Sequence, residues 1–275
     1  MSSLASAKST APGTVSAMAL GEPVQEHTFF GVSFANLTLP EFLELVDARV
    51  ADRTPAFVVT PNVDHICRIQ QDDAFRAAYG RAWLRVVDST ILVWASRLLR
   101  APLREKLSGS DLIYLLSEHA ARKSHRVFYF GAAPGVAEAA AQALAQRYPG
   151  LEVAGTHCPP MDFEKEHETH QAALDAVNAA QPDILFVAMG CPRQEIWLAE
   201  VFEQLGVPVA IGIGASLDFA SGRVKRAPVW MQKSGLEWFW RLCLEPRRMW
   251  RRYLVQDAAF AAILIRELLR KRRRA

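Results

Sequence analysis

The feature that most constrains the fold is a series of short apolar runs, several of them followed by a segment with helical periodicity. The runs are "AFVVT" (56–60), "LRVVD" (84–88), "RVFYF" (126–130), "LEVAGT" (151–156), "DILFVAM" (183–189) and "VPVAIGI" (207–213). They are continuous rather than alternating, which is typical of strands buried on both faces of a parallel sheet. We therefore predict an α/β fold, a Rossmann-like parallel sheet sandwiched by helices.

The helical patterns lie between these runs, at about 63–81, 110–122 and 136–148. Ser110 or Asp111 is a candidate cap for the start of the second of these helices. The 275-residue chain then divides into three parts: a Ser-, Ala-, Gly- and Pro-rich segment at 1–25, an α/β domain at 26–230, and a purely helical C-terminal part at 231–275. We expect the first part to be a disordered leader, because it lacks the long apolar core of a signal peptide.

Charge is unevenly distributed along the chain. The net charge is only +3, but from Arg241 onward Arg and Lys far outnumber the acidic Glu245, Asp257 and Glu267. This local excess indicates an anionic partner at the C-terminal part and gives no reason to expect nucleic-acid binding by the whole chain. The longest apolar run there, "AAFAAILI", is far shorter than the roughly 20 residues that span a bilayer.

The four cysteines are widely spaced and form no CxxC motif, which argues against a disulfide framework or a zinc site and fits a reducing cytosol. His167 and His170 in "EKEHETH" have a spacing that could hold a metal, but a solvated helix face explains them more simply. Cys158 has no visible activating partner, so a thiolate nucleophile is not expected.

Polar and glycine-rich turns follow five of the predicted strands. Ligands bind beyond the carboxyl ends of strands in a parallel sheet, so these turns predict one shared site. The turns are Thr60-Pro61-Asn62, Asp88-Ser89-Thr90, "GAAPG" (131–135), the stretch 190–195, and "GIGASLDFASGRVKRAP" (212–228).

Several of these residues have an alternative structural role. Asp88 could cap a helix, and Gln194 and Glu195 could be first-turn residues favoured by the helix dipole. "GAAPG" could be an ordinary strand-to-helix turn. Asp64 and His65 could form an acid–base unit, although we expect them to face solvent or the flank of a helix.

Two late segments make the chain resemble a known family. They are "GCPRQEIW" and "GIGASLDFASGRVKRAPVWMQKSGLEWFWRLCLEPRRMWRRY", and they are accompanied by "TPN" (60–62), "VVDST" (86–90) and "SGSDL" (108–112). Over about residues 27–255 the chain resembles the WecG/TagA/CpsF family of bacterial glycosyltransferases, also called family 26. That family makes exopolysaccharide, enterobacterial common antigen and wall teichoic acid linkage units.

The resemblance implies an inverting transfer from a UDP-sugar to a polyprenyl-pyrophosphate-linked saccharide. It implies that Asp88 is the general base and that Thr60 and Gln194 share the catalytic work. Ser89 stands where Gly is common in the family, which bears on sugar or acceptor choice. The substrate-binding residues expected on this basis are Asn62, Ser89, Ser108, Gly109, Asp111, Gly131, Gly190, Arg193, Glu195, Gly212, Gly214, Asp218, Lys225 and Arg226.

Inverting transfer needs a base for the acceptor hydroxyl and stabilisation of the departing diphosphate. The chain has no DxD motif to hold a divalent ion, so we expect no metal and no other cofactor. Two alternatives remain open: a nucleotide-dependent oxidoreductase on the same fold class, and a nonenzymatic membrane adaptor that uses the basic C-terminal part.

The C-terminal part interleaves bulky aromatic residues with arginine. Arginine suits lipid phosphates, and tryptophan suits the membrane interface. The residues expected to contact membrane or acceptor are Arg241, Arg247, Arg248, Trp250, Arg251 and Arg252. We expect a cytoplasmic protein that is peripheral to the inner leaflet of the cell membrane, with a helical seam between copies of a homo-oligomer as the alternative.

Overall fold

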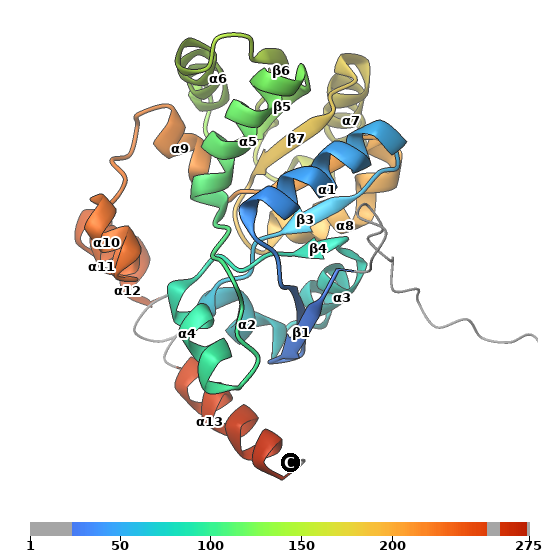
Figure 1. Cartoon of the computed structure of the whole chain (residues 1–275). Helices are drawn as coiled ribbons and strands as arrows, with labels where there is room; N and C mark the ends of the chain where they lie inside the picture. Colours follow the sequence, from blue (N-terminus) through green and yellow to red (C-terminus); the bar gives the residue numbers. More distant parts are fainter. Residues whose placement is uncertain (1–23, 252–258, 274–275) are drawn as a thin grey trace, which may run out of the picture.

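The computed structural model describes residues 24–251 and 259–273 (Figure 1). Its centre is a six-stranded parallel sheet in the order β4-β3-β8-β7-β5-β6. The strands are β3 (Phe57–Val59), β4 (Leu84–Arg85), β5 (Arg126–Gly131), β6 (Glu152–His157), β7 (Ile184–Ala188) and β8 (Val209–Gly212). The predicted parallel α/β fold is therefore confirmed.

Helices cover both faces of the sheet because successive strand residues point to opposite faces. Phe57, Val59 and Phe130 point to one face of the sheet and pack against a first set of helices. Val58 and Tyr129 point to the other face and pack against a second set. The first set comprises α2 (Val63–Ile69), α3 (Asp73–Arg81), α4 (Thr90–Leu98), α7 (His167–Ala180) and α8 (Arg193–Leu205). The second comprises α1 (Leu39–Asp52), α5 (Gly109–Lys123), α6 (Val136–Arg147) and α9 (Ser216–Ala220).

Four local predictions were wrong. The helix expected over 63–81 is two helices, because the Asp72 carboxylate accepts the Phe75 amide hydrogen and starts α3 anew. Ser108, not Ser110 or Asp111, is the N-cap residue of α5. The strand expected over 84–88 is only β4, and the edge strand β6 is only half-buried. A hairpin of β1 (Glu26–Phe29) and β2 (Val32–Ala35) was not predicted.

The C-terminal part contains helices only: α10 (Val229–Lys233), α11 (Glu237–Leu244), α12 (Pro246–Arg251) and α13 (Ala259–Arg272). Helix α13 is attached to the α/β domain, since Phe260 is buried in its core and contacts the Phe30 ring edge-on at 5.3 Å. Its membrane association is not visible in the fold and stays a prediction. Within 24–251 and 259–273, no helix is both long and apolar enough to cross a membrane.

Candidate functional site

A pocket of about 470 Å³ lies at the carboxyl ends of β3, β4, β7 and β8, within the usual size range for a small-ligand site. Of the predicted site residues it is lined by Thr60, Asn62, Asp88, Ser89, Gly190, Gln194, Gly214 and Arg241. Trp238 and Arg241 reach it from α11, so the C-terminal part contributes to its wall. The strand-end turns predicted to converge do converge, apart from the "GAAPG" turn.

Asp88 lies one residue before the N-cap of α4 and is held by the backbone on both sides. Its amide donates to the Pro61 carbonyl at 2.9 Å, and the amide of Leu107 donates to the carbonyl of the preceding Val87 at 2.8 Å. Burial raises the pKa of Asp88 to about 8; Lys106 opposes this shift and Glu237 adds to it. A carboxyl group with such a pKa is a much stronger base than an ordinary aspartate.

Gln194 joins two of the turns that form the pocket. Its side-chain oxygen accepts the amide hydrogens of Gly190 at 3.2 Å and Gly214 at 3.1 Å. Thr60 makes a similar link, because its hydroxyl donates to the Gly212 carbonyl at 3.1 Å. Both side chains line the pocket and hold together the turns that form it. Their part in catalysis stays a prediction.

Glu195 does not line the pocket and was predicted to bind substrate. Its side chain is 0% exposed and lies behind Gln194, whose amide nitrogen donates to it at 2.7 Å. Burial raises the pKa of Glu195 to about 7, and its second oxygen, Oε2, has no hydrogen-bond partner among the described residues. The geometry makes Glu195 a positioning residue for Gln194.

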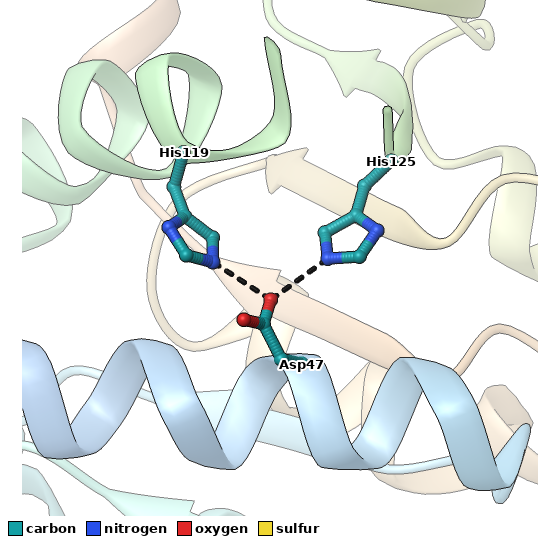
Figure 2. Close-up of side chains that lie close together, drawn as sticks. All are labelled: Asp47, His119 and His125. Atoms are coloured by element: carbon teal, nitrogen blue, oxygen red, sulfur yellow. Dashed lines mark hydrogen bonds and ion pairs between the residues drawn. The ribbon is translucent and has the colours of Figure 1, made fainter. Parts of the chain in front are cut away.

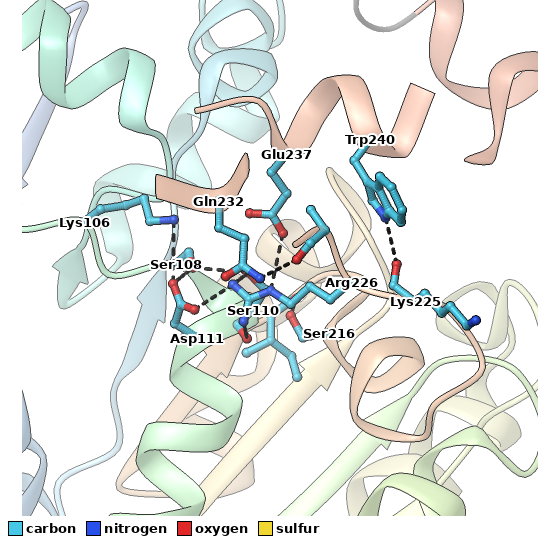
Figure 3. Close-up of polar contacts among 12 residues, drawn as sticks. Lys106, Ser108, Ser110, Asp111, Ser216, Lys225, Arg226, Gln232, Glu237 and Trp240 are labelled. Carbon is cyan, nitrogen blue, oxygen red and sulfur yellow. Dashed lines mark hydrogen bonds and ion pairs between the residues drawn. The ribbon is translucent and has the colours of Figure 1, made fainter. Parts of the chain in front are cut away.

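Arg226, Asp111 and Ser108 were also predicted to bind substrate, but they form a structural network (Figure 3). Arg226 donates to Asp111 at 2.6 Å and to the Ser110 carbonyl at 3.0 Å, and it pairs with Glu237 of α11 at 3.4 Å. The Ser108 hydroxyl donates to the same Asp111 carboxylate. This network fastens the start of α11, and thus one wall of the pocket, to α5.

Lys225 belongs to the same junction through its backbone. Its carbonyl accepts the indole hydrogen of Trp240 at 3.1 Å (Figure 3). The Lys225 side chain was predicted to bind substrate, and it does not line the pocket.

The remaining predicted residues lie outside the pocket. Arg193 makes two bonds of 2.8 Å to Glu164, and Asp218 pairs with Arg223 at 3.7 Å. Three of the predicted glycines lie in close contact with a neighbouring segment. A Cβ on Gly131 would lie 2.7 Å from the Ala188 carbonyl oxygen, one on Gly212 2.7 Å from the Gln194 amide nitrogen, and one on Gly109 3.1 Å from Ile213 Cα.

The pocket also contains side chains that were not predicted to line it, above all Lys106, Asp64, His65 and Cys191. Asp64 and His65 are buried, contrary to the expectation that they face solvent or a helix flank, and His65 Nδ1 is 2.6 Å from the Tyr79 hydroxyl. Their position in the first turn after Asn62, at a strand end, was the signal that could have found them. Lys106 enters from the loop before α5 and had no such signal.

The basic aromatic block of the C-terminal part is only partly described. Arg241 lines the pocket and stacks on the Phe219 ring at 5.6 Å. On α12, Arg247 and Trp250 are exposed, and Arg248 and Arg251 belong to the same helix. Arg252 lies outside the described residues.

Two groups among the described residues have a composition that could hold a metal: Asp64 with His65 and Cys191 in the pocket, and Asp47 with His119 and His125 elsewhere. His167 and His170 are in neither, and His170 accepts the Trp197 indole hydrogen at 3.1 Å. His170 is thus half-buried and bonded to Trp197, which differs from the expected solvated helix face, whereas His167 is exposed as expected.

Asp47, on α1, is the centre of the second group and faces His119 on α5 and His125 just before β5 (Figure 2). One of its carboxylate oxygens accepts from His119 at 2.7 Å and from His125 at 2.8 Å, and Lys123 lies 3.3 Å from the other. His125 directly precedes β5, so this cluster lies toward the amino edge of the sheet, opposite the pocket. It fastens α1 to the end of α5.

The chain matches the model of the "Glycosyl transferase WecG/TagA/CpsF family" over residues 27–274. It is similar to the N-acetylglucosaminyldiphosphoundecaprenol N-acetyl-beta-D-mannosaminyltransferase of Bacillus spizizenii, at 32% identity over 86% of this chain and 90% of that protein. It is similar to the protein of the same name in Staphylococcus aureus strain NCTC 8325, at 32% identity over 80% of this chain and 85% of that one. This chain therefore belongs to the WecG/TagA/CpsF family of glycosyl transferases.

Proposed function

We propose that this glycosyltransferase moves a sugar from a UDP-sugar to a saccharide linked to polyprenyl diphosphate, with inversion at the anomeric carbon. The names of the two relatives make an N-acetylmannosaminyl donor and a GlcNAc-diphosphoundecaprenol acceptor the first pair to test. The transfer would take place at the inner face of the cell membrane, as a step in the synthesis of a surface glycan. Family membership replaces the oxidoreductase and adaptor alternatives.

The observation that carries the proposal is the placement of Asp88 in one pocket with two cations, Lys106 and Arg241. The acceptor hydroxyl oxygen would bond to the anomeric carbon while the bond from that carbon to the UDP oxygen breaks. Asp88 would take the hydroxyl proton, and the electron pair of the broken bond would leave with UDP. Inversion follows because a single displacement attacks from the face opposite the leaving group.

The departing diphosphate carries the charge that the pocket has to stabilise. Lys106 is half-buried and Arg241 stacks on Phe219, so both cations are partly withdrawn from solvent, which strengthens their attraction for phosphate. These two side chains can take the role that a divalent ion has in many other transferases, so we propose transfer without a metal.

The direct test is release of UDP from a panel of UDP-sugars with polyprenyl-diphosphoryl-GlcNAc as acceptor. We expect turnover with one donor or a few, and a product whose anomeric configuration is opposite to that of the donor by NMR. A product with retained configuration would refute the single displacement. UDP release from no donor in the panel would refute the proposed reaction.

A further inference from the structure

Three side chains whose chemistry suits a metal ion meet in the pocket. Asp64 and His65 are in the first turn of α2, which follows β3, and Cys191 is in the turn after β7. Because β3 and β7 both neighbour β8, these two turns come together at the carboxyl edge of the sheet. One ligand atom from each of the three residues lies within 4.8 Å of the other two. The proposed transfer gives this group no role.

The spacing of these atoms is close to what a zinc ion requires. Zinc bonds to nitrogen or oxygen at about 2.0–2.2 Å and to thiolate sulfur at about 2.3 Å, almost always with tetrahedral geometry. Ligand atoms around one tetrahedral ion are therefore about 3.3–3.7 Å apart. From the 4.8 Å limit, each pair has to close by at most about 1.5 Å, which small side-chain rotations can supply.

The ligand types favour zinc over magnesium. A thiolate and an imidazole suit zinc and other late transition metals, whereas magnesium takes oxygen ligands in an octahedron. Of the three residues, only Asp64 supplies oxygen. Three protein ligands also leave the fourth tetrahedral position open to water or to a substrate oxygen. The group is therefore suited to an ion other than the magnesium that commonly binds a diphosphate.

The surrounding residues hold both parts of the group in place. Asp64 is 6% exposed and His65 is 3% exposed, and His65 Nδ1 is 2.6 Å from the Tyr79 hydroxyl. An outer partner of this kind commonly orients a histidine that binds a metal. On the other side, the Gln194 oxygen accepts an amide hydrogen from the turn that carries Cys191. The two turns are thus fixed near the positions that an ion would need.

Buried acidic groups beside the three residues also favour a cation. Glu195 is completely buried, and its pKa is raised to about 7, chiefly by burial and further by the charge of Asp64, while Arg68 opposes the shift. The two carboxylates therefore lie close enough for Asp64 to oppose a charge on Glu195. A divalent cation bound to Asp64 would remove this conflict.

We propose that Asp64, His65 and Cys191 bind Zn²⁺ and that the bound ion inhibits the transferase. The ion would lie in the same pocket as Lys106 and Arg241. Its open position would take a diphosphate oxygen of UDP, so a third cation would hold the product and slow its release. The cysteine spacing did not reveal this site, because its ligands come from two segments far apart in the chain. The inhibition rests on the proposed function, whereas zinc binding can be measured without donor or acceptor.

The test is calorimetric titration of the full chain with Zn²⁺ after EDTA treatment and dialysis, with Co²⁺ as a spectroscopic substitute. Cys191→Ala removes the thiolate, and Asp64→Asn removes the carboxylate charge. Two matched controls make the same cysteine substitution elsewhere: Cys243→Ala at an exposed position, where adventitious zinc would bind, and Cys158→Ala at a half-buried position outside the pocket. Thermal melting of each variant checks that it is folded.

We expect one zinc ion per chain, no competition from magnesium, and a thiolate-to-cobalt charge-transfer band. Cys191→Ala should lose this band and bind zinc more than about a hundredfold more weakly, because a lost ligand costs more than the ten- to hundredfold typical of a lost outer partner. Asp64→Asn should keep the band and bind at least about tenfold more weakly. Both controls should bind like the unchanged chain.

Activity is compared for each protein with its own value in the absence of zinc. Zinc should lower kcat of the unchanged chain at least about tenfold, EDTA should restore it, and the same zinc concentration should leave Cys191→Ala uninhibited. Zinc that binds as expected without lowering kcat would overturn the inhibition. If zinc binds as expected but no donor yields UDP, the proposed function fails and the zinc site stands.

Two binding results would overturn the site itself. One is a chain that binds no zinc at micromolar concentrations, or a folded Cys191→Ala variant that binds it like the unchanged chain. The other is binding that is lost only in Cys243→Ala, which would mean an adventitious ion only.

Discussion

Asp88 and Asp47 are both partly buried aspartates, yet their surroundings move their pKa values in opposite directions. For Asp47, burial alone would raise the pKa, but the hydrogen bonds from His125 and His119 outweigh it and hold the pKa below its usual range. For Asp88, burial prevails and raises the pKa to about 8. A negative charge is thus stabilised at the amino edge of the sheet and disfavoured at the carboxyl edge.

The difference follows from the partners that each carboxylate has. Asp47 receives direct hydrogen bonds from donors on α5 and on the turn after it. Asp88 has Lys106 and Arg241 in its surroundings, but Glu237 and Asp111 counteract them. Asp47 therefore contributes to stability, whereas Asp88 has the proton affinity that base catalysis needs.

The largest effect is expected from removing the base. Asp88→Asn keeps the shape of the side chain but cannot accept the acceptor proton, so kcat should fall by roughly 10²–10⁴-fold. UDP affinity, measured by calorimetry, should be nearly unchanged. Asp47→Asn is the matched control, since it makes the same substitution at the other carboxylate and should leave kcat unchanged. Near-normal turnover by Asp88→Asn would remove Asp88 from this role.

A smaller loss should come from the residue that orients Gln194. Glu195→Ala frees the Gln194 amide, and the resulting misplacement at the pocket floor should lower kcat by about 10²-fold. Glu195→Gln keeps an oxygen that can accept the Gln194 N–H and should restore most of the activity. If Glu195 has only a structural role, both variants should melt at a lower temperature and their kcat values should not differ from each other. If Glu195→Ala and Glu195→Gln lose kcat equally, the side-chain oxygen at position 195 does not hold Gln194 in place.

The two aspartates should also differ in stability. Because the pKa of Asp47 is lowered on folding, its stabilisation is present above the ordinary pKa of 3.8 and is lost as the pH falls below it. Asp47→Asn should cost about 1–3 kcal/mol of unfolding free energy at pH 7. Asp88, with its raised pKa, has the opposite effect: its cost to stability is absent below the ordinary pKa of 3.8, grows as the pH rises from there to about 8, and is constant above that, so Asp88→Asn should be more stable than the unchanged chain at pH 9.

Urea unfolding of both variants at pH 4, 7 and 9 measures these changes. The gain of Asp88→Asn should shrink as the pH falls toward 4. If the two substitutions shift stability in the same direction at pH 9, the contrast between the two carboxylates is wrong.

The smallest effect is expected from chelation. Transfer should continue in EDTA, because Lys106 and Arg241 are proposed to neutralise the diphosphate. Activity that is lost in EDTA and restored by magnesium or manganese would show that a divalent ion is required. Recovery with zinc alone would point to Asp64, His65 and Cys191, whose ligand atoms lie within 4.8 Å of one another.

Much of the pocket could be predicted from the sequence because the carboxyl ends of parallel strands meet at one edge. Thr60, Asp88 and Gln194 each follow a strand, so their convergence needed only the strand pattern. Lys106 and Trp238 reach the pocket from a loop and a helix whose placement depends on tertiary packing. No local pattern marks such residues.

The sequence was misleading where an opposite charge decides a side chain's role. The Arg226 guanidinium is a group that commonly binds phosphate, and for that reason it was predicted to bind substrate. In the structure it pairs with Asp111, which lies 115 residues earlier in the chain. Glu195 is adjacent to Gln194 in a helix, and its complete burial depends on the packing of α8 against the sheet.

The most direct test of the central claim is to titrate the Asp88 carboxyl itself. The carboxyl carbon of Asp88, identified in ¹³C-labelled protein by its absence from Asp88→Asn, should titrate near pH 8 in NMR spectra. The value of kcat/KM should rise along the same curve, about tenfold between pH 7 and pH 9, because only the deprotonated form can accept a proton. A carboxyl that titrates near pH 4, or a kcat/KM that stays flat over this range, would contradict the account.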